Sequence, residues 1–304
     1  MEYRRLGRSG LRVSEICLGT MTFGASVDET ASIDLVNLAL DAGINFFDTA
    51  DGYSMGRSEE ILGKALKGRR REAVVATKFF NPMGPGPNDS GMSRVYIMNA
   101  IEDSLRRLQM DHVDIYYIHH VDRETPLEEM LRALDDLVHQ GKVRYIACSN
   151  YQAWRLCEAM WISDANKLAR FECYQPQYSL VVRDIEQELL PLSLNNGFGI
   201  VSRGPMAGGF LTGKYQPGQR MLPGTRSEEQ WAWMPRFFAQ NADETLSTLL
   251  DVAQELGRTP AQVALRWVLE QPAVTAVIAG VRTPEHMRDN VGATGWKLEG
   301  KPLK

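Results

Sequence analysis

The sequence has few cysteines, and they follow no pattern. Cys17, Cys148, Cys157 and Cys173 are too few and too scattered for a disulfide framework or a paired zinc site. Each of them lies in an apolar stretch, so we expect four reduced, buried thiols.

Positive charge and long apolar runs are also missing. The net charge of -4 provides no broad basic field, which argues against sequence-independent nucleic-acid binding and favours a small-molecule partner. The first twenty residues are rich in charge, and no apolar run approaches the roughly 20 residues that span a bilayer. We therefore expect no membrane association and a cytoplasmic location.

Short apolar runs rich in β-branched or aromatic residues recur along all 304 residues. Eight of them are predicted strands: residues 15–19, 45–48, 73–78, 113–119, 143–149, 171–175, 199–203 and 274–279. Segments with helical periodicity separate them, such as the stripe of Ile97, Ile101, Leu105 and Leu108. Because parallel strands need crossover helices, this alternation predicts one α/β domain over residues 1–304, a (β/α)8 TIM barrel.

An open, doubly wound sheet is the rival fold. It would have a GxGxxG fingerprint after its first strand, which residues 19–24 lack. Ahead of that strand, residues 3–6 and 11–13 flank Gly7 to Gly10 and predict a hairpin that closes the barrel floor. Long loops are expected at residues 81–91 and 214–241, as functional lids or as flexible surface.

Helix starts are signalled by threonine before proline. Thr125, Thr259 and Thr283 each precede a proline, which places a capping hydroxyl before a residue whose φ already suits a helix. We expect all three threonines to be N-caps.

Polar residues end most of the predicted strands. They are Asp48, Lys78, His119, Ser149 with Asn150, Gln175, and Ser202 with Arg203. Alone, Asp48 could cap a turn and His119 could be a structural histidine. A buried lysine needs a carboxylate partner, and Asp48 on the adjacent strand is the obvious one for Lys78. Since active sites of such barrels form where the strands end, these residues predict one.

Three segments also show a family resemblance. Residues 46–53, 75–78 and 114–120 resemble the aldo-keto reductase motifs that supply a tetrad of Asp, Tyr, Lys and His. The resemblance covers essentially the whole chain and implies the catalytic residues Asp48, Tyr53, Lys78 and His119. It implies that Tyr53 protonates a carbonyl that a nicotinamide cofactor reduces, and that His119 orients it. Lys78 beside the phenol should favour its ionised form and make Tyr53 a better acid.

The resemblance further implies NADPH as cofactor, with NADH weaker. Its ligands would be Gly19, Thr20, Met21, Ser149, Asn150, Gln175, Ser202, Arg203, Gly204, Pro205, Met206, Gly208, Lys214, Gly280, Val281, Arg282, His286, Asp289 and Asn290. Arg203 stands where relatives often have an aromatic ring, and His286 where they have glutamine or arginine. The near P-loop from Gly208 fails because Tyr215 replaces the magnesium-binding hydroxyl.

Other functions stay open. A Schiff-base aldolase could use Lys78 as nucleophile, and some family members act as channel partners with an intact tetrad. The pair His119 and His120 lacks a third well-spaced ligand, so no metal is expected. The residues expected to line a pocket for a small carbonyl substrate are Phe23, Phe80, His120, Tyr151 and Trp231. The sequence does not reveal the substrate or the oligomeric state.

Overall fold

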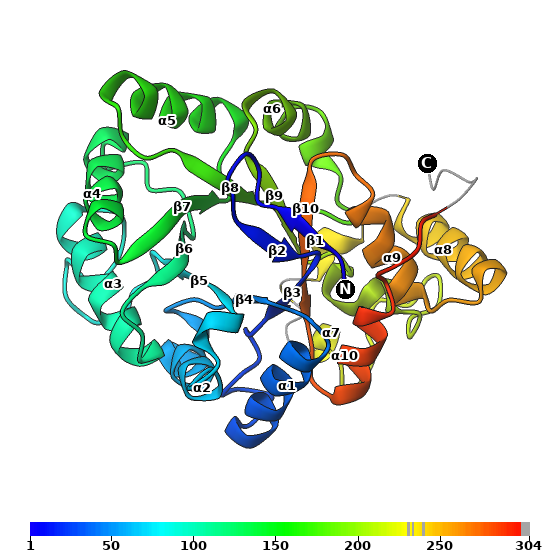
Figure 1. Cartoon of the computed structure of the whole chain (residues 1–304). Coiled ribbons are helices and arrows are strands. Elements are labelled where there is room, and N and C mark those ends of the chain that lie inside the picture. Colours follow the sequence, from blue (N-terminus) through cyan, green and yellow to red (C-terminus); the bar gives the residue numbers. More distant parts are fainter. Residues whose placement is uncertain (230–231, 233, 239–240, 299–304) are drawn as a thin grey trace.

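The computed structural model of the chain describes residues 1–229, 232, 234–238 and 241–298. In this part of the chain, eight parallel strands pair side by side into a closed barrel (Figure 1). In chain order they are β3 (Ile16–Gly19), β4 (Phe46–Asp48), β5 (Val74–Phe79), β6 (Val113–Ile118), β7 (Val143–Ser149), β8 (Phe171–Gln175), β9 (Gly199–Arg203) and β10 (Val274–Gly280). Strand β10 pairs with both β3 and β9, which closes the ring and confirms the predicted fold.

Helices surround the barrel (Figure 1). They are α1 (Glu29–Asp41), α2 (Arg57–Ala65), α3 (Arg94–Leu108), α4 (Leu127–His139), α5 (Ala153–Asn166), α6 (Leu189–Asn196), α7 (Arg226–Glu229), α8 (Ala242–Leu256), α9 (Pro260–Leu269) and α10 (Pro284–Val291). No helix in the described residues has both the length and the apolar character that crossing a membrane would require.

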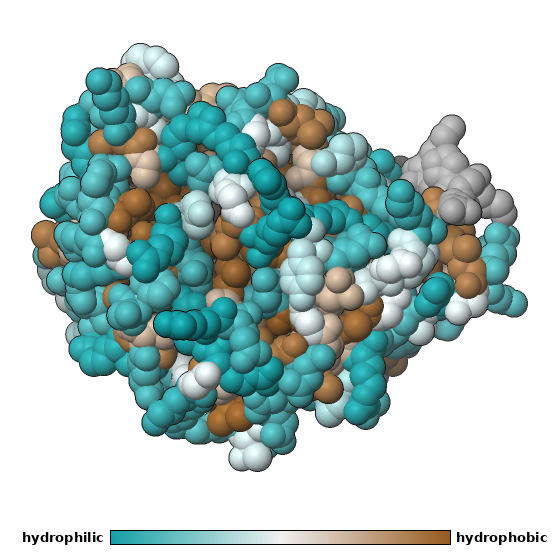
Figure 2. All heavy atoms as spheres, viewed as in Figure 1, coloured by the Kyte–Doolittle hydropathy of each residue, from teal (hydrophilic) through white to brown (hydrophobic). Residues whose placement is uncertain are grey.

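A hairpin closes the floor of the barrel, as the sequence predicts. Strands β1 (Tyr3–Arg5) and β2 (Arg12–Ser14) pair antiparallel and cross the barrel end that faces the viewer in Figure 1. Leu6 is fully buried in the apolar cluster inside the barrel. Gly7 has φ of 55°, and a Cβ there would lie 2.5 Å from the Gly197 carbonyl oxygen, so only glycine fits. Hydrophilic side chains cover most of this face, with apolar patches near its centre (Figure 2).

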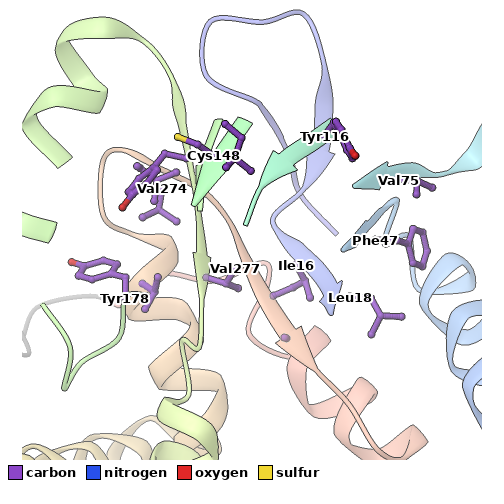
Figure 3. Packing of buried hydrophobic residues seen from close by; sticks show 14 of the residues in the cluster. Ile16, Leu18, Phe47, Val75, Tyr116, Cys148, Tyr178, Val274 and Val277 are labelled. Atoms are coloured by element: carbon purple, nitrogen blue, oxygen red, sulfur yellow. The ribbon is translucent and has the colours of Figure 1, made fainter. Parts of the chain in front are cut away.

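Two apolar clusters lie on the two faces of the barrel wall. Ile16, Leu18, Phe47, Val75 and Tyr116 belong to the outer cluster, which the helices cover (Figure 3). The inner cluster contains Leu6 and Val13 from the hairpin and the inward-facing residues of the barrel strands: Cys17, Phe46, Val74, Ala76, Ile115, Tyr117, Ala147, Cys173, Val201 and Ala276. Side chains of a strand alternate between faces, so position along the strand decides which cluster a residue joins.

Two local predictions were wrong. Thr125 is not the N-cap of α4, because its hydroxyl donates to Asp122 instead and Pro126 precedes the helix without a side-chain cap. Cys157 is exposed, because it lies on the outer face of α5, whereas the other three cysteines are buried. The other two caps are confirmed: Thr259 forms a capping box with Gln262, and Thr283 accepts from the backbone of His286.

Candidate active site

The polar strand ends continue the inward-facing pattern of the barrel. Two positions before each of them is a member of the inner cluster: Phe46, Ala76, Tyr117, Ala147, Cys173 or Val201. Alternation therefore turns the polar side chains to the same inner face, at the end opposite the hairpin: Asp48, Lys78, His119, Ser149, Gln175 and Arg203. A cavity of about 830 Å³ beside Arg4 and Phe198 lies at the floor, away from these residues.

Lys78 is fully buried at the centre of the site. Its Nζ lies 2.5 Å from Asp48 Oδ1, 2.8 Å from the Thr49 carbonyl oxygen and 3.2 Å from the Tyr53 hydroxyl. Burial lowers the pKa of Lys78, but the Asp48 carboxylate and the Tyr53 hydroxyl raise it by more, and the net shift is upward. Lys78 is therefore an ammonium ion that contacts both partners predicted for it.

Tyr53 reaches Lys78 from a tight turn after β4. The turn continues through Ser54 and Met55, both at positive φ, and returns the chain to α2. Burial raises the pKa of the Tyr53 phenol, while the Lys78 ammonium lowers it, and burial has the larger effect. Lys78 thus acts on the phenol in the direction that the sequence predicts, whereas the larger effect of burial could not be read from the sequence.

His119 lies beside Tyr53. The two ring centroids are 5.9 Å apart in an edge-to-face arrangement, and the His119 ring stacks on His120 at 4.6 Å. Burial, assisted by the charges of Lys78 and Arg203, lowers the pKa of His119 to about 2. Its imidazole is therefore neutral over the whole physiological pH range.

Asn150 joins the histidine to Arg203. Its backbone is left-handed, with φ of 62°, and its Nδ2 donates to the His119 carbonyl at 2.8 Å. Arg203 Nη2 donates to Asn150 Oδ1 at 2.6 Å, while Arg203 Nε is buried with no hydrogen-bond partner among the described residues. The Ser149 and Ser202 hydroxyls donate to the backbone of β8 and the segment after it.

Comparison with known proteins agrees with this arrangement. The model of the Aldo/keto reductase family matches residues 15–301. The chain belongs to the aldo/keto reductase family. It is 41% identical to "Uncharacterized oxidoreductase YrpG" of Bacillus subtilis (strain 168), over 100% of this chain and 94% of that protein. It is 37% identical to "Probable voltage-gated potassium channel subunit beta" of Arabidopsis thaliana, over 96% of this chain and 91% of that protein. Family membership supports a nicotinamide-dependent oxidoreductase in general.

In this aldo/keto reductase, the loop after β9 brings a lysine against a left-handed turn of the backbone. Gly208 and Gly209 both have positive φ, of 66° and 100°. A Cβ at Gly209 would lie 3.0 Å from Lys214 Nζ, so the glycine lets the lysine approach the backbone. The Lys214 ammonium beside this turn suits an anionic group such as a phosphate. The nearby Gly204 also has positive φ, Pro205 is buried and Met206 is partly buried.

The start of α10 fits a second anionic group. Val281 and Arg282 precede the Thr283 cap, and His286 is exposed in the first turn. Asn290 is buried, and its Nδ2 has no hydrogen-bond partner within the described residues. Such an orphaned donor can serve a ligand. Asp289 is already used to join α10 to α9, because its Oδ1 accepts from Thr259 and Gln262.

The remaining predicted cofactor residues lie at the ends of β3 and β10. Thr20 is buried and donates to the Asp48 carbonyl, whereas Met21 is exposed. Gly19 is required by close packing, since a Cβ there would lie 2.6 Å from the Ile278 side chain, while Gly280 faces open space. Gly280 and Met21 thus leave accessible surface at this part of the rim.

The predicted substrate residues divide into two groups. Phe80 and His120 are partly accessible and pack edge to face at 5.3 Å. Phe23 and Tyr151 belong to the outer apolar cluster and are 0% and 2% exposed, so placing them on an open pocket was wrong. Trp231 lies outside the described residues.

Sequence reasoning missed two polar residues behind the site. Asp51 is fully buried two residues before Tyr53, and burial together with the Glu59 charge raises its pKa to about 7. Asn81 Nδ2 lies 3.3 Å from His119 Nδ1. Asp51 could have been noticed as a second carboxylate beside the tyrosine, but no sequence signal pairs Asn81 with His119. No group of three or more metal-ligating side chains occurs in the described residues.

Proposed function

We propose that this aldo/keto reductase reduces an aldehyde or ketone to an alcohol with NADPH, and that Tyr53 is the general acid. The observation that supports this most strongly is the contact of the Lys78 ammonium with both the Asp48 carboxylate and the Tyr53 hydroxyl. Consistent with the sequence, we propose a single-domain cytoplasmic enzyme whose partner is a small carbonyl compound, with no nucleic acid or membrane partner.

The residues of the site would divide the work between them. A carbonyl oxygen that gains negative charge needs a proton, and Tyr53 is the protonated group beside the buried ammonium. As the proton leaves, the phenolate that forms is stabilised by Lys78 at 3.2 Å, and Asp48 keeps that ammonium charged and in place. The neutral His119 would donate a hydrogen bond that orients the carbonyl oxygen toward Tyr53.

The rim of the barrel fits the cofactor. When bound, the reduced nicotinamide supplies the hydride that is added to the carbonyl carbon. Asn150, Gln175 and Arg203 offer amide and guanidinium groups for its carboxamide and ring. Lys214 and the Gly208–Gly209 turn would hold the pyrophosphate, and Arg282 with Asn290 the adenosine phosphate end.

A second candidate function is regulation of an ion channel. It is favoured by the similarity to proteins named as potassium channel subunits beta, at 37% identity for the Arabidopsis thaliana relative and 36% for that of Schizosaccharomyces pombe. A regulatory subunit would bind the cofactor and turn over very slowly. The polar contacts of the site serve both functions equally.

The aldolase hypothesis is less compatible with the site. A Schiff-base lysine must lose its proton to attack a carbonyl, whereas Lys78 is held as an ammonium by Asp48 and has no exposed surface. Borohydride reduction in the presence of a carbonyl compound should therefore leave Lys78 unmodified, which mass spectrometry can establish.

The decisive experiment is a turnover assay. NADPH oxidation is followed across aldehydes, ketones, sugars and steroid-like ketones, and NADPH affinity is measured in parallel. Rapid oxidation with at least one of these classes supports the reductase. Tight NADPH binding with negligible turnover across the whole panel would support the regulatory subunit instead.

A further inference from the structure

Asn81 lies beside the His119 ring, and neighbouring residues hold it there. It follows β5, and its Nδ2 lies 3.3 Å from His119 Nδ1. Its backbone carbonyl accepts a hydrogen bond from the Tyr96 hydroxyl at 2.8 Å, and the same hydroxyl lies 3.3 Å from Asp51 Oδ2. Tyr96 is buried, so this contact fixes the backbone of Asn81 from the side of α3.

Gly52 makes room for the amide on the other side. A Cβ at position 52 would lie 2.8 Å from Asn81 Nδ2 and 3.3 Å from Asn81 Cβ. Gly52 itself has φ of -73°, a value that any residue adopts, so its backbone does not require glycine. The space it leaves is the space that the Asn81 amide fills. The amide is therefore confined between Gly52 and His119.

This contact bears on which imidazole nitrogen has the proton, since its donor and its acceptor depend on the tautomer of the ring. With the amide nitrogen of Asn81 toward the ring, the NH2 group can only donate, so the arrangement favours an unprotonated His119 Nδ1 that accepts. A neutral imidazole has one N–H, and the burial and cationic neighbours of His119 disfavour a second proton. The hydrogen of the neutral ring is then on Nε2.

We propose that Asn81 is a positioning residue that locks His119 in the Nε2–H tautomer. The consequence for catalysis rests on the proposed function. With the proton on Nε2, His119 can donate a hydrogen bond to the carbonyl oxygen of the substrate, which can only accept one. Tyr96, which also contacts Asp51, holds the backbone of Asn81 through its hydroxyl. Through this one amide, the segment after β5 contacts His119, the residue that follows β6.

The tautomer can be measured directly by NMR. In protein labelled with 15N-histidine, long-range proton–nitrogen correlations distinguish a protonated from an unprotonated ring nitrogen, and His119→Gln identifies the His119 signals. We expect an unprotonated Nδ1 and a protonated Nε2. A protonated Nδ1 in the unaltered protein would overturn the proposal.

Two variants test the cause. In Asn81→Asp the carboxylate accepts instead of donating, so the proton should move to Nδ1, and kcat should fall by about 100-fold, as when one donor to a developing oxyanion is lost. Gly52→Ala leaves the backbone allowed and displaces the amide, so it should give a mixture of tautomers. Unchanged His119 signals in both folded variants would contradict the role of Asn81.

The control is Asn88→Asp, the same substitution at an exposed position in the segment after β5. Asn88→Asp should change neither the His119 tautomer nor the rate. If it changed the His119 ring-nitrogen signals as much as Asn81→Asp does, the added negative charge alone would explain the effect, and the role of Asn81 would be refuted. The NMR result does not depend on turnover. If the tautomer is as expected but no carbonyl compound is reduced, the proposed function fails, whereas the role of Asn81 in setting the His119 tautomer is retained.

Discussion

Gln175 Nε2 donates to Asp48 Oδ2 at 2.8 Å, across the barrel from the Lys78 ammonium that contacts Oδ1. Both oxygens of the buried carboxylate are thus satisfied, one by a charged donor and one by a neutral donor. A buried carboxylate with both oxygens engaged has a fixed orientation. Gln175 therefore helps to hold the charge on which Lys78 depends, in addition to any contact with a cofactor.

Removing the carboxylate should destabilise the protein. In Asp48→Asn the buried Lys78 loses its counter-charge, and the free energy of unfolding should fall by about 3–5 kcal/mol in urea titrations. Asp41→Asn is the matched control, because Asp41 is an exposed partner of Arg69 and should cost about 1 kcal/mol or less. Adding Lys78→Met should recover part of the loss. Equal losses of unfolding free energy in Asp48→Asn and Asp41→Asn would contradict a stabilising buried ion pair between Asp48 and Lys78.

Removing the phenolic hydroxyl should abolish turnover and leave cofactor binding intact. Tyr53→Phe keeps the ring but cannot donate a proton, so kcat should fall by at least about 100-fold while NADPH affinity, measured by fluorescence titration, stays nearly constant. Tyr3→Phe removes a hydroxyl on the floor face and should have no effect on the rate. Normal turnover in Tyr53→Phe would eliminate this tyrosine as the acid.

The stability of the protein should depend on pH through Asp51. Its pKa is about 7 in the folded state and near the ordinary 3.8 when unfolded, so the folded form binds more protons between these values. The contribution of Asp51 to the free energy of unfolding is thus complete below its pKa in the unfolded chain. It is lost as the pH rises through its pKa in the folded chain, about 7. The loss is about 4 kcal/mol at most, at about 1.4 kcal/mol per pKa unit. Glu59, Arg107 and Tyr96 face this carboxyl group.

Asp51→Asn provides the test of that dependence. Asparagine cannot ionise, so the difference in unfolding free energy between about pH 5 and about pH 8 should be smaller than in the unaltered protein. Urea titrations at both pH values measure it. If the two proteins have the same pH dependence, Asp51 titrates near its ordinary pKa.

Preference for NADPH over NADH should depend on Arg282. Arg282→Ala removes a cation before the α10 cap and should weaken NADPH binding much more than NADH binding, because only NADPH has the additional phosphate. Arg288→Ala, at an exposed position on the same helix, should affect both cofactors little. An equal loss for both cofactors in Arg282→Ala would argue against contact with that phosphate.

Much of the fold could be predicted from the sequence. The predicted bounds of β7, β8 and β9 match the structure, because most residues of these strands are apolar and buried and polar residues end them. The contact between Lys78 and Asp48 was also predictable, since a buried lysine needs a carboxylate and the two residues end adjacent strands.

The errors concern side chains whose surroundings come from distant segments. Phe23 and Tyr151 have aromatic side chains typical of pocket walls, but both are almost fully buried in the folded chain. Thr125 resembles a cap, yet Asp122 three residues earlier competes for its hydroxyl. The amide of Asn81 contacts His119, which is 38 residues away in sequence, and no local pattern reveals this pair.

The alternation of inner and outer residues limits how this protein can change in length. Inserting or deleting one residue within a barrel strand would exchange its two faces, so the polar residue at its end would face the helices and an apolar residue the barrel mouth. A change in a loop has no such effect. Changes of length that preserve the site are therefore confined to the loops, whereas the length of every strand that ends in the site is fixed to the single residue.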